Sequence, residues 1–569
     1  MLILKSKNAG TTMYKIIATE RLQLECDARS GVIRKIIHPP HKLDLAKDPR
    51  QYVIIRTPQA ISDPAVLTHI QLRKVDEKSI TILFTADLEG YQAELCFAST
   101  PLGIECTLRA IAPQPIWLVE WKITGLQLDE ILVPALGGQS IDKGMPADTA
   151  LSYKYPFWWN SQFVIGRLQK GGVWLYSRDI RPNLKLLRIG KDQVGFSLTY
   201  GYEAAAPLQK KELQFSWYLD GYMNNWQEAV DQHRVWLEKS FGLLPLSRNE
   251  YFPDWARKIN LVLELWGARK DKVVNLNTFE CMIDRIEQWR QFHPPEKTLL
   301  YLPGFAENGI DSHAPDYQPS QLLGGEPAFK KFMTAAHHLG YKVMIHTNVL
   351  AMTFTHPQYK KFKKFQVIDP FERPQGWGLD IDGDWLAEPY FAYINPGYRE
   401  WGDLMEKVLG DLVQKYEVDG IFLDQTLLAF NVSRGPNFLE GMRDHITRMQ
   451  KAFPKVLFAG EGMHEYVISC LPMAQIHGLD SILEVHGMEG QVAWRKVHPV
   501  STYLFNKYVR FTGHLLTKHP LHPLLSFQEA AYSAIGVLPA LCLYDYDQPI
   551  DTPMTRKMID RANRLEKDF

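Results

Sequence analysis

The sequence predicts a multidomain protein in which an N-terminal antiparallel β-sandwich precedes a parallel (β/α)8 barrel. Three observations lead to this fold class. The chain has 569 residues, which is long for one compact domain. Short, alternating strand candidates fill its first part, up to about residue 222. After residue 250, apolar strands alternate with amphipathic helices, a pattern typical of repeated βα units.

The composition excludes several classes of partner. Lys and Arg total 64, and so do Asp and Glu, so the chain has no formal net charge to attract a nucleic acid or an anionic membrane surface. The longest apolar runs are too short to cross a bilayer. The 6 cysteines form no CxxC pair, which favours reduced thiols. Because MLILKSKNAG lacks the order of a signal peptide, we expect a cytoplasmic protein.

The predicted sandwich covers residues 1–222. Its strand candidates are rich in Val, Ile, Leu and Thr, with turn residues between them: RLQLEC, SGVIRKII, QYVIIRT, SITILFTADL, YQAELCFAS, GIECTLRAI and GVWLYSR. Such spacing is typical of an antiparallel sandwich. A connecting helix and linker follow over 223–250, because Ala229, His233 and Leu237 share one helical face before Gly242.

The predicted barrel covers residues 251–569. Its strand candidates are 259–266, 298–305, 341–350, 418–424, 456–461, 480–485 and 535–544, and an eighth strand is expected within 501–511. Helical segments lie between them, such as PAFKKFMTAAHHLG and REWGDLMEKVLGDLVQKYE. An open doubly wound sheet is the alternative, but it would usually carry a glycine-rich phosphate loop, and neither GxGxxG nor GxxxxGK[ST] occurs.

Two acidic residues end successive predicted strands of the barrel. Asp424 ends the fourth strand, inside VDGIFLD, and Glu461 ends the fifth, inside VLFAGE. Catalytic groups of such barrels sit at the carboxyl ends of the strands, so these two carboxylates can converge over the barrel mouth. A facing pair of carboxyl groups is what cleavage of a glycosidic bond requires. The structural alternative is a helix cap for Asp424 and a buried ion pair for Glu461.

Several segments resemble known glycoside hydrolases. PAFKKFMTAAHHLGYKVMIHTNV, VDGIFLD and FAGE resemble the segments around strands three to five of the alpha-amylase superfamily. ARSGVIRKIIHP, PDYQPSQLLGGEPAF and INPGYREWGDLMEKVLGDLVQKYEVDGIFLDQ resemble a bacterial group similar to endo-alpha-N-acetylgalactosaminidases. This resemblance implies a galactose-mutarotase-like sandwich before the barrel. It also implies that Asp424 is the nucleophile and Glu461 the acid/base of a retaining hydrolase of alpha-linked sugars.

The sequence departs from the amylase pattern at three places. Phe422 stands where amylases carry an arginine, two residues before the nucleophile. His346 stands where they carry the aspartate of the third strand, and no Asn-His-Asp motif occurs near the seventh strand. These departures favour a distant retaining glycosidase over a typical amylase.

Other polar and aromatic residues lie at or just beyond the predicted strand ends. We interpret the following as candidate substrate-binding residues: Glu264, Trp266, His346, Asn348, His464, Glu484 and His486. Loop capping is the alternative for His346 and Asn348, and core packing for Trp266. His464 could instead orient Glu461, and Glu484 is the replacement acid if Glu461 is not catalytic.

The sequence predicts no cofactor and no metal site. HExxH is absent, so HEYVIS is not a zinc motif. Asp380, Asp382 and Asp384 alternate in an acidic loop, but the glycine and the final glutamate of a calcium-binding hand are missing. An acidic hairpin tip is therefore the favoured interpretation of this loop.

Two functions remain open from the sequence. The first is a glycoside hydrolase that acts on an oligosaccharide or glycoside. The second is a non-catalytic carbohydrate-binding or scaffold protein on a glycosidase-like barrel. Fold alone cannot separate them, but the two strand-end acids favour the enzyme. An aldolase-type barrel would need a strand-end lysine, and the predicted strands offer none.

Overall fold

The computed structural model describes residues 14–268, 277–307, 309–379, 387–477, 494–514, 517 and 519–565. The chain divides into two compact units. The first comprises residues 1–240 together with 492–504, and the second comprises residues 241–491 together with 505–569. No helix within the described part of the chain is both long enough and apolar enough to span a membrane.

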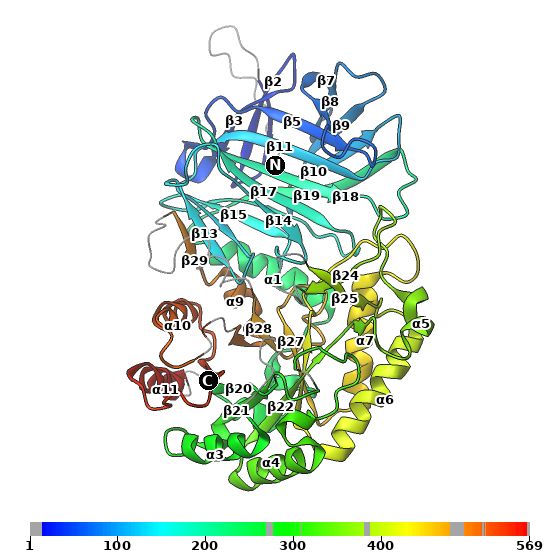
Figure 1. Ribbon diagram of the computed structural model, residues 1–569. Helices are drawn as coiled ribbons and strands as arrows, with labels where there is room; N and C mark the ends of the chain where they lie inside the picture. Colours follow the sequence, from blue (N-terminus) through cyan, green and yellow to red (C-terminus); the bar gives the residue numbers. More distant parts are fainter. Residues whose placement is uncertain are drawn as a thin grey trace. The chain divides into compact units, whose positions relative to one another are not determined.

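The first unit is built from antiparallel sheets, as the sequence predicts (Figure 1). Its four-stranded sheet contains β1 (Tyr14–Ala18), β2 (Gln23–Asp27), β3 (Ile33–His38) and β4 (Leu43–Asp44). Its six-stranded sheet has the order β14 (Ala150–Tyr155), β17 (Lys185–Lys191), β18 (Phe196–Glu203), β11 (Leu118–Leu126), β5 (Gln51–Arg56) and β6 (Ala65–Leu67).

The third sheet of this unit has ten strands. Their order is β29 (Arg495–Val497), β13 (Gln139–Asp142), β12 (Glu130–Val133), β15 (Phe163–Arg167), β16 (Gly172–Tyr176), β19 (Glu212–Tyr222), β10 (Gly103–Ile111), β9 (Gln92–Thr100), β8 (Ser79–Thr85) and β7 (His69–Val75). Aromatic residues join this sheet to the six-stranded one, because Trp217 of β19 packs against Trp121 of β11 with ring centroids 5.2 Å apart. This packing is the core of a sandwich.

One segment falls outside the sequence-based boundaries. Residues 492–504 belong to the first unit, although the sequence analysis places them in the barrel. There β29 pairs with β13, and the Arg495 guanidinium donates a hydrogen bond of 2.7 Å to the Gln139 side chain. The expected connecting helix is α1 (Gln227–Phe241), which buries Ala229, His233 and Leu237 as its apolar face predicts.

The second unit is the predicted parallel barrel. Its eight-stranded sheet has the order β20 (Leu261–Leu265), β21 (Thr298–Leu302), β22 (Lys342–Asn348), β26 (Gly420–Asp424), β27 (Leu457–Glu461), β28 (Met473–Ile476) and β30 (Arg510–Gly513), with β31 (Ala540–Leu543) beside β20. A parallel bridge between Thr512 and Leu538 brings the two ends of the sheet together. Every residue of β20 and β21 is buried, which explains why these strands read as continuous apolar runs.

The last three strands differ from the sequence-based assignment. The sixth position is taken by β28, whereas the strand predicted at 480–485 lies outside the described residues. The seventh strand, β30, overlaps the end of the 501–511 segment. The segment predicted as the seventh strand, 535–544, contains the eighth strand, β31.

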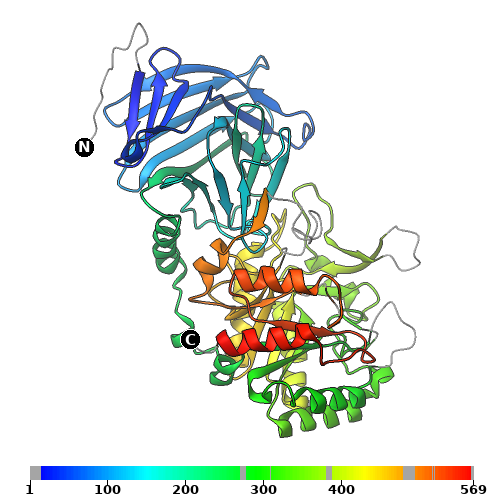
Figure 2. The same ribbon diagram turned by 90° about the vertical axis from the view of Figure 1, so that its left-hand side faces the viewer.

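Helices cover the outside of the sheet. The longer ones are α3 (Phe279–Trp289), α4 (Gly325–Leu339), α6 (Arg399–Tyr416), α7 (Phe438–Ala452), α10 (Leu525–Ala534) and α11 (Pro553–Leu565). Figure 2 shows α10 and α11 side by side in orange-red and red, where the Arg561 guanidinium donates a hydrogen bond of 2.8 Å to Glu529. The Thr278 hydroxyl caps α3, and Gly340, with a φ of 98°, ends α4.

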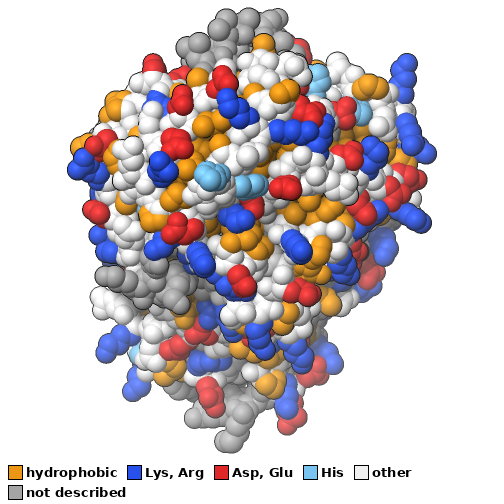
Figure 3. Space-filling view, turned by 90° about the horizontal axis from the view of Figure 1, so that it is seen from below, with side chains coloured by type: hydrophobic (Ala, Val, Ile, Leu, Met, Phe, Trp, Pro, Cys, Tyr) orange, Lys and Arg blue, Asp and Glu red, His pale blue; other side chains and the backbone are white. Residues whose placement is uncertain are grey.

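Shorter elements complete this unit. They are α2 (Asp254–Lys258), α5 (Tyr359–Phe362) and a small sheet of β23 (Ala351–Thr353), β25 (Glu388–Tyr393) and β24 (Gly376–Leu379). The short helix α9 (Val500–Phe505), which follows β29, belongs to the first unit except for its last residue. On the face displayed in Figure 3, basic and acidic side chains are interspersed, in keeping with the balanced composition.

Candidate active site

The carboxyl ends of β22, β26 and β27 bring three polar residues to one level. Asn348 pairs with Asp424 in the parallel register, and Leu423 pairs with Gly460, so that Asp424 and Glu461 end neighbouring strands at the same depth. Side chains at this end of a parallel barrel surround its mouth. Asp424 and Glu461 therefore lie at matching depth, as the sequence analysis predicts.

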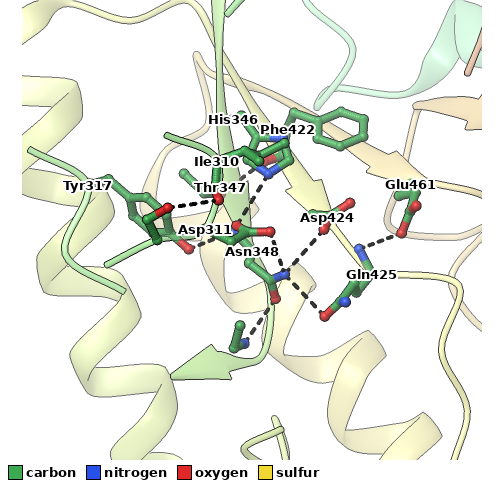
Figure 4. A network of polar contacts seen from close by, with 12 residues as sticks. Ile310, Asp311, Tyr317, His346, Thr347, Asn348, Phe422, Asp424, Gln425 and Glu461 are labelled. Atoms are coloured by element: carbon green, nitrogen blue, oxygen red, sulfur yellow. Dashed lines mark hydrogen bonds and ion pairs between the residues drawn. The ribbon is translucent and has the colours of Figure 1, made fainter. Parts of the chain in front are cut away.

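Gln425 links the two acidic residues. Its backbone N–H donates a hydrogen bond of 2.9 Å to Oε2 of Glu461 (Figure 4). The hydroxyl of the next residue, Thr426, donates one of 3.1 Å to the Glu461 backbone carbonyl. Gln425 has a φ of 64°, a left-handed conformation that is uncommon for a residue other than glycine. The turn after Asp424 thus aims a backbone donor at the neighbouring carboxylate.

Asn348 is the hub of a polar network beside this pair. Its Nδ2 lies 3.3 Å from Oδ2 of Asp424, 3.1 Å from Oε1 of Gln425 and 3.5 Å from Oδ2 of Asp311 (Figure 4). Its Oδ1 accepts hydrogen bonds from the backbone N–H groups of residues 350 and 351. Because both ends of the amide are bonded, its orientation is determined, and Nδ2 faces the carboxylates.

Asp311 is a third carboxylate of the site, and the sequence analysis missed it. It lies in the loop after β21, is 8% exposed and has a φ of 56°. Its Oδ1 lies 3.3 Å from Nε2 of His346, whose Nδ1 lies 2.6 Å from the Tyr301 hydroxyl. A search of strand ends misses Asp311, because this residue lies on a loop. The available signal was the polar DSHAPDY segment in a βα loop.

Two more tyrosines that sequence reasoning missed complete the network. The Tyr317 hydroxyl accepts a hydrogen bond of 2.8 Å from the Asn348 backbone N–H. The Tyr393 hydroxyl, from β25, accepts one of 3.2 Å from Nε2 of Gln425. Tyr393 lies in the apolar run YFAYI, which gives no hint of its polar contact, whereas Tyr317 ends the polar DSHAPDY segment.

Two histidines lie on the other side of Glu461. His477 directly follows β28, and its Nε2 lies 3.1 Å from Oε1 of Glu461. His514 directly follows β30, and its ring centroid lies 4.5 Å from that of His477. The sequence analysis did not select them, because it assigned the sixth and seventh strands to other segments.

The two carboxyl groups have opposite electrostatic surroundings. Burial raises the pKa of Asp424 well above its usual value, and the neighbouring carboxylates of Glu461 and Asp311 raise it further. Burial alone would raise the pKa of Glu461, but His477, His514 and the Gln425 N–H lower it. These surroundings favour the protonated form of Asp424 and the ionised form of Glu461.

The predicted pair at the end of β20 lies next to this network. Glu264 is 6% exposed and accepts a hydrogen bond from the indole N–H of Trp266. The pKa of Tyr301 is raised first by burial and then by the Glu264 and Asp424 carboxylates, so Glu264 belongs to the same cluster of charges. Trp266 also packs edge-on against Tyr544, with ring centroids 5.0 Å apart.

The remaining predicted site residues are His464, Glu484 and His486. His464 is fully buried, and burial lowers its pKa to about 3, so the ring is neutral. Its Nδ1 accepts a hydrogen bond of 3.2 Å from the Tyr466 backbone N–H, and the ring faces Tyr466. Glu484, His486 and the acidic loop at 380–384 lie outside the described residues.

Solved structures with the same fold include two kinds of alpha-glycosidase. The alpha-N-acetylgalactosaminidase NagBb from Bifidobacterium bifidum, ligand-free, matches with a TM-score of 0.70 and 11% sequence identity over 97% of this chain and 92% of that chain. Its GalNAc complex gives 0.69 and 11% over 97% and 93%. The alpha-galactosidase TtGalA from Thermus thermophilus, in complex with p-nitrophenyl alpha-D-galactopyranoside, gives 0.52 and 11% over 87% and 95%. At these low identities the structural likeness establishes a shared sandwich-and-barrel fold.

Sequence comparisons identify a family. A comparison with curated protein sequences finds no match. A family model described as a domain of unknown function, DUF6259, matches residues 212–515, from the last strand of the sandwich to just beyond β30. The chain therefore belongs to the DUF6259 family.

Proposed function

We propose that the protein is a retaining glycoside hydrolase that cleaves alpha-linked sugars, with Asp424 as nucleophile and Glu461 as acid/base. The observation that carries this proposal is the meeting of two half-buried carboxyl groups at the ends of adjacent barrel strands, where the N–H of Gln425, the residue after Asp424, donates a hydrogen bond to Glu461. A carboxyl pair in a barrel mouth is the equipment for glycosidic cleavage. The fold shared with alpha-glycosidases supports the same reaction class.

The substrate that we propose is a galactose-configured sugar in alpha linkage. The two kinds of solved relative are an alpha-N-acetylgalactosaminidase and an alpha-galactosidase. Their sugars share the galactose ring and differ at the 2-position. The site offers several polar groups for ring hydroxyls, among them the Asp311 carboxylate, His346 and Glu264. We expect these residues to bind the sugar ring.

The reaction would proceed in two steps. A carboxylate oxygen of Asp424 attacks the anomeric carbon while the Glu461 carboxyl donates its proton to the departing glycosidic oxygen. Water then attacks the glycosyl–Asp424 ester, and Glu461 takes up the water proton, which restores both groups. The surroundings of the pair favour the proton on Asp424, whereas the first step requires it on Glu461, so substrate binding must reverse this preference. As positive charge develops at the anomeric carbon in the transition state, it stabilises the ionised Asp424.

Azide rescue tests the roles of both residues. The substrates are p-nitrophenyl alpha-galactoside and p-nitrophenyl alpha-N-acetylgalactosaminide. For Glu461→Ala, azide should attack the glycosyl–enzyme intermediate and restore turnover as an alpha-glycosyl azide. For Asp424→Ala, azide should replace the nucleophile and give the beta-glycosyl azide. Because general acid–base help is worth about 10²–10⁴-fold, Glu461→Ala should lose far more rate on alkyl glycosides than on aryl ones.

The other outcomes of this experiment are equally informative. If Asp424→Ala gives the alpha-azide and Glu461→Ala the beta-azide, the roles are exchanged, as the raised pKa of Asp424 and the lowered pKa of Glu461 would allow. If the wild-type protein binds these sugars without turnover, the protein is a carbohydrate-binding protein on a glycosidase-like barrel. Rescue of neither variant would remove the pair from the mechanism.

A further inference from the structure

Three neighbouring strands of the barrel end in residues with metal-binding side chains. β27 ends in Glu461, His477 follows β28, and His514 follows β30, and these strands adjoin in the order β30–β28–β27. Ile476 pairs with Gly513, so the two histidines, each one residue later, lie level across the parallel pair. Three strands thus bring two imidazoles and one carboxylate to one place.

The donor atoms of these side chains are close enough to share one ion. One donor atom from each residue lies within 4.8 Å of the other two. Nε2 of His477 lies 3.1 Å from Oε1 of Glu461. Zinc–ligand bonds of about 2.0–2.1 Å in a tetrahedron separate donor atoms by roughly 3.3 Å. The His477–Glu461 pair, at 3.1 Å, already has nearly this spacing, and the His514 donor atom lies within 4.8 Å of both.

The type and exposure of the donors point to a transition metal. Two imidazoles with one carboxylate form a three-ligand set that suits zinc and its neighbours, whereas calcium and magnesium prefer oxygen ligands. The side chains of Glu461 and His477 are 14% and 19% exposed, so an ion can reach them from solvent. We propose that Glu461, His477 and His514 bind a transition-metal dication, such as Zn²⁺ or Co²⁺, with a coordination position left for water.

Occupation of this site would control the adjacent chemistry. An ion on Glu461 takes the lone pairs that an acid/base needs to receive and donate a proton. Bound Zn²⁺ should therefore inhibit hydrolysis, and a chelator should relieve the inhibition. This consequence rests on the proposed glycosidase function, whereas the binding of the metal does not.

Binding is measured on the full chain without any sugar. Zn²⁺ alone is titrated by calorimetry, and Co²⁺ by its visible absorption, which reports a four- or five-coordinate site. We expect one ion per chain. His514→Ala and the milder His514→Gln should both weaken binding by more than the about 10–100-fold that the loss of an outer-shell partner costs. His477→Ala should do the same, and circular dichroism establishes that each variant is folded.

A second group of residues provides the matched control. Asp311, His346 and Asp424 also place donor atoms within 4.8 Å of one another, and none of them belongs to the group of Glu461, His477 and His514. His346→Ala should leave the affinity for Zn²⁺ within about twofold. Loss of binding in His346→Ala but not in His514→Ala would overturn the assignment, as would a wild-type chain that binds no Zn²⁺ or Co²⁺. If the chain binds the metal but hydrolyses neither sugar even after a chelator has removed the ion, the result would support the metal site while removing the proposed function.

Discussion

The backbone N–H of Gln425 lies 2.9 Å from the Glu461 carboxylate, one residue after Asp424. One peptide unit therefore connects the two acidic groups of the site. Any shift of the turn that carries Asp424 also moves the donor that holds Glu461. The left-handed φ of 64° at Gln425 is what directs this donor sideways toward the next strand.

The first prediction concerns the strain at Gln425. Gln425→Ala and Gln425→Gly both lose the side-chain contacts with Asn348 and Tyr393. Only glycine adopts the left-handed conformation without steric cost, so Gln425→Gly should be about 1 kcal/mol more stable than Gln425→Ala. Urea unfolding of the two variants measures the difference. Equal stabilities would mean that the left-handed turn stores no strain.

The second prediction separates stability from activity at Asp424. Asp424→Asn should lower turnover at least about 10³-fold, because the amide cannot act as a nucleophile. The same change should raise the free energy of unfolding at pH 7 by on the order of 1 kcal/mol, since asparagine has no carboxyl group whose ionisation is opposed by burial and by the Glu461 and Asp311 carboxylates. The pKa of folded Asp424 is raised, so this gain should vanish below about pH 4, where the folded and unfolded chains are both protonated.

Asp419 provides the matched control for this stability prediction. It precedes β26, and its carboxylate lies 2.7 Å from the Lys342 ammonium and 2.9 Å from His337. Burial opposes its ionisation, but the His337 and Lys342 contacts lower its pKa. Asp419→Asn should therefore destabilise the protein at pH 7, and this loss should shrink as the pH falls through the folded pKa. A gain in stability for Asp419→Asn would contradict the electrostatic argument for both residues.

The third prediction tests the support of Asn348. Tyr317→Phe removes the hydroxyl that accepts the Asn348 N–H and leaves a buried donor unpaired, at a cost of about 1–3 kcal/mol. Tyr390→Phe is the control, because its hydroxyl donates to the Ser312 carbonyl in a part-buried position, and its loss should cost less. Thermal unfolding compares the two variants. A smaller effect for Tyr317→Phe than for Tyr390→Phe would exclude the proposed support.

The fourth prediction uses a buried histidine of helix α7. His445 is 3% exposed, and neither ring nitrogen has a hydrogen-bond partner among the described residues. Burial lowers its pKa to about 4, with Arg448 adding to the effect. An unfolded histidine protonates near about pH 6.5, so the unfolded chain binds more protons between these values, and stability falls as the pH decreases from about 6.5 to 4.

His445→Leu should remove this acid-induced loss. The wild type should lose up to about 3 kcal/mol through His445 over this interval, and the leucine variant should lose correspondingly less. Urea midpoints at pH 7.5 and pH 5 measure the change. His338→Leu, at an exposed position of helix α4, should keep the wild-type slope. Identical slopes for the wild type and His445→Leu would show that His445 does not stay neutral on folding.

Local sequence patterns were sufficient for most of the architecture. The barrel strands from β20 to β27 are continuous apolar runs in the sequence, because both faces of a parallel barrel strand are buried. Apolar and polar residues alternate along the sandwich strands, because only one face of each strand packs on a facing sheet. The depth of Asp424 and Glu461 followed from the same reasoning, because consecutive parallel strands end at one edge.

Tertiary structure alone decided which other residues meet these two acids. Asp311 lies on a loop, where only the polar DSHAPDY segment gave a signal. His477 and His514 follow strands whose short apolar runs resemble their surroundings, so no local pattern marks these two histidines. The assignment of 492–504 to the first unit depends on pairing between β29 and β13, which lie far apart in the sequence. Periodicity indicates which face of an element is buried, whereas the residue on the other side of a contact depends on how the whole chain folds. These tertiary contacts determine the surroundings of Asp424 and Glu461, and with them the direction in which each pKa shifts.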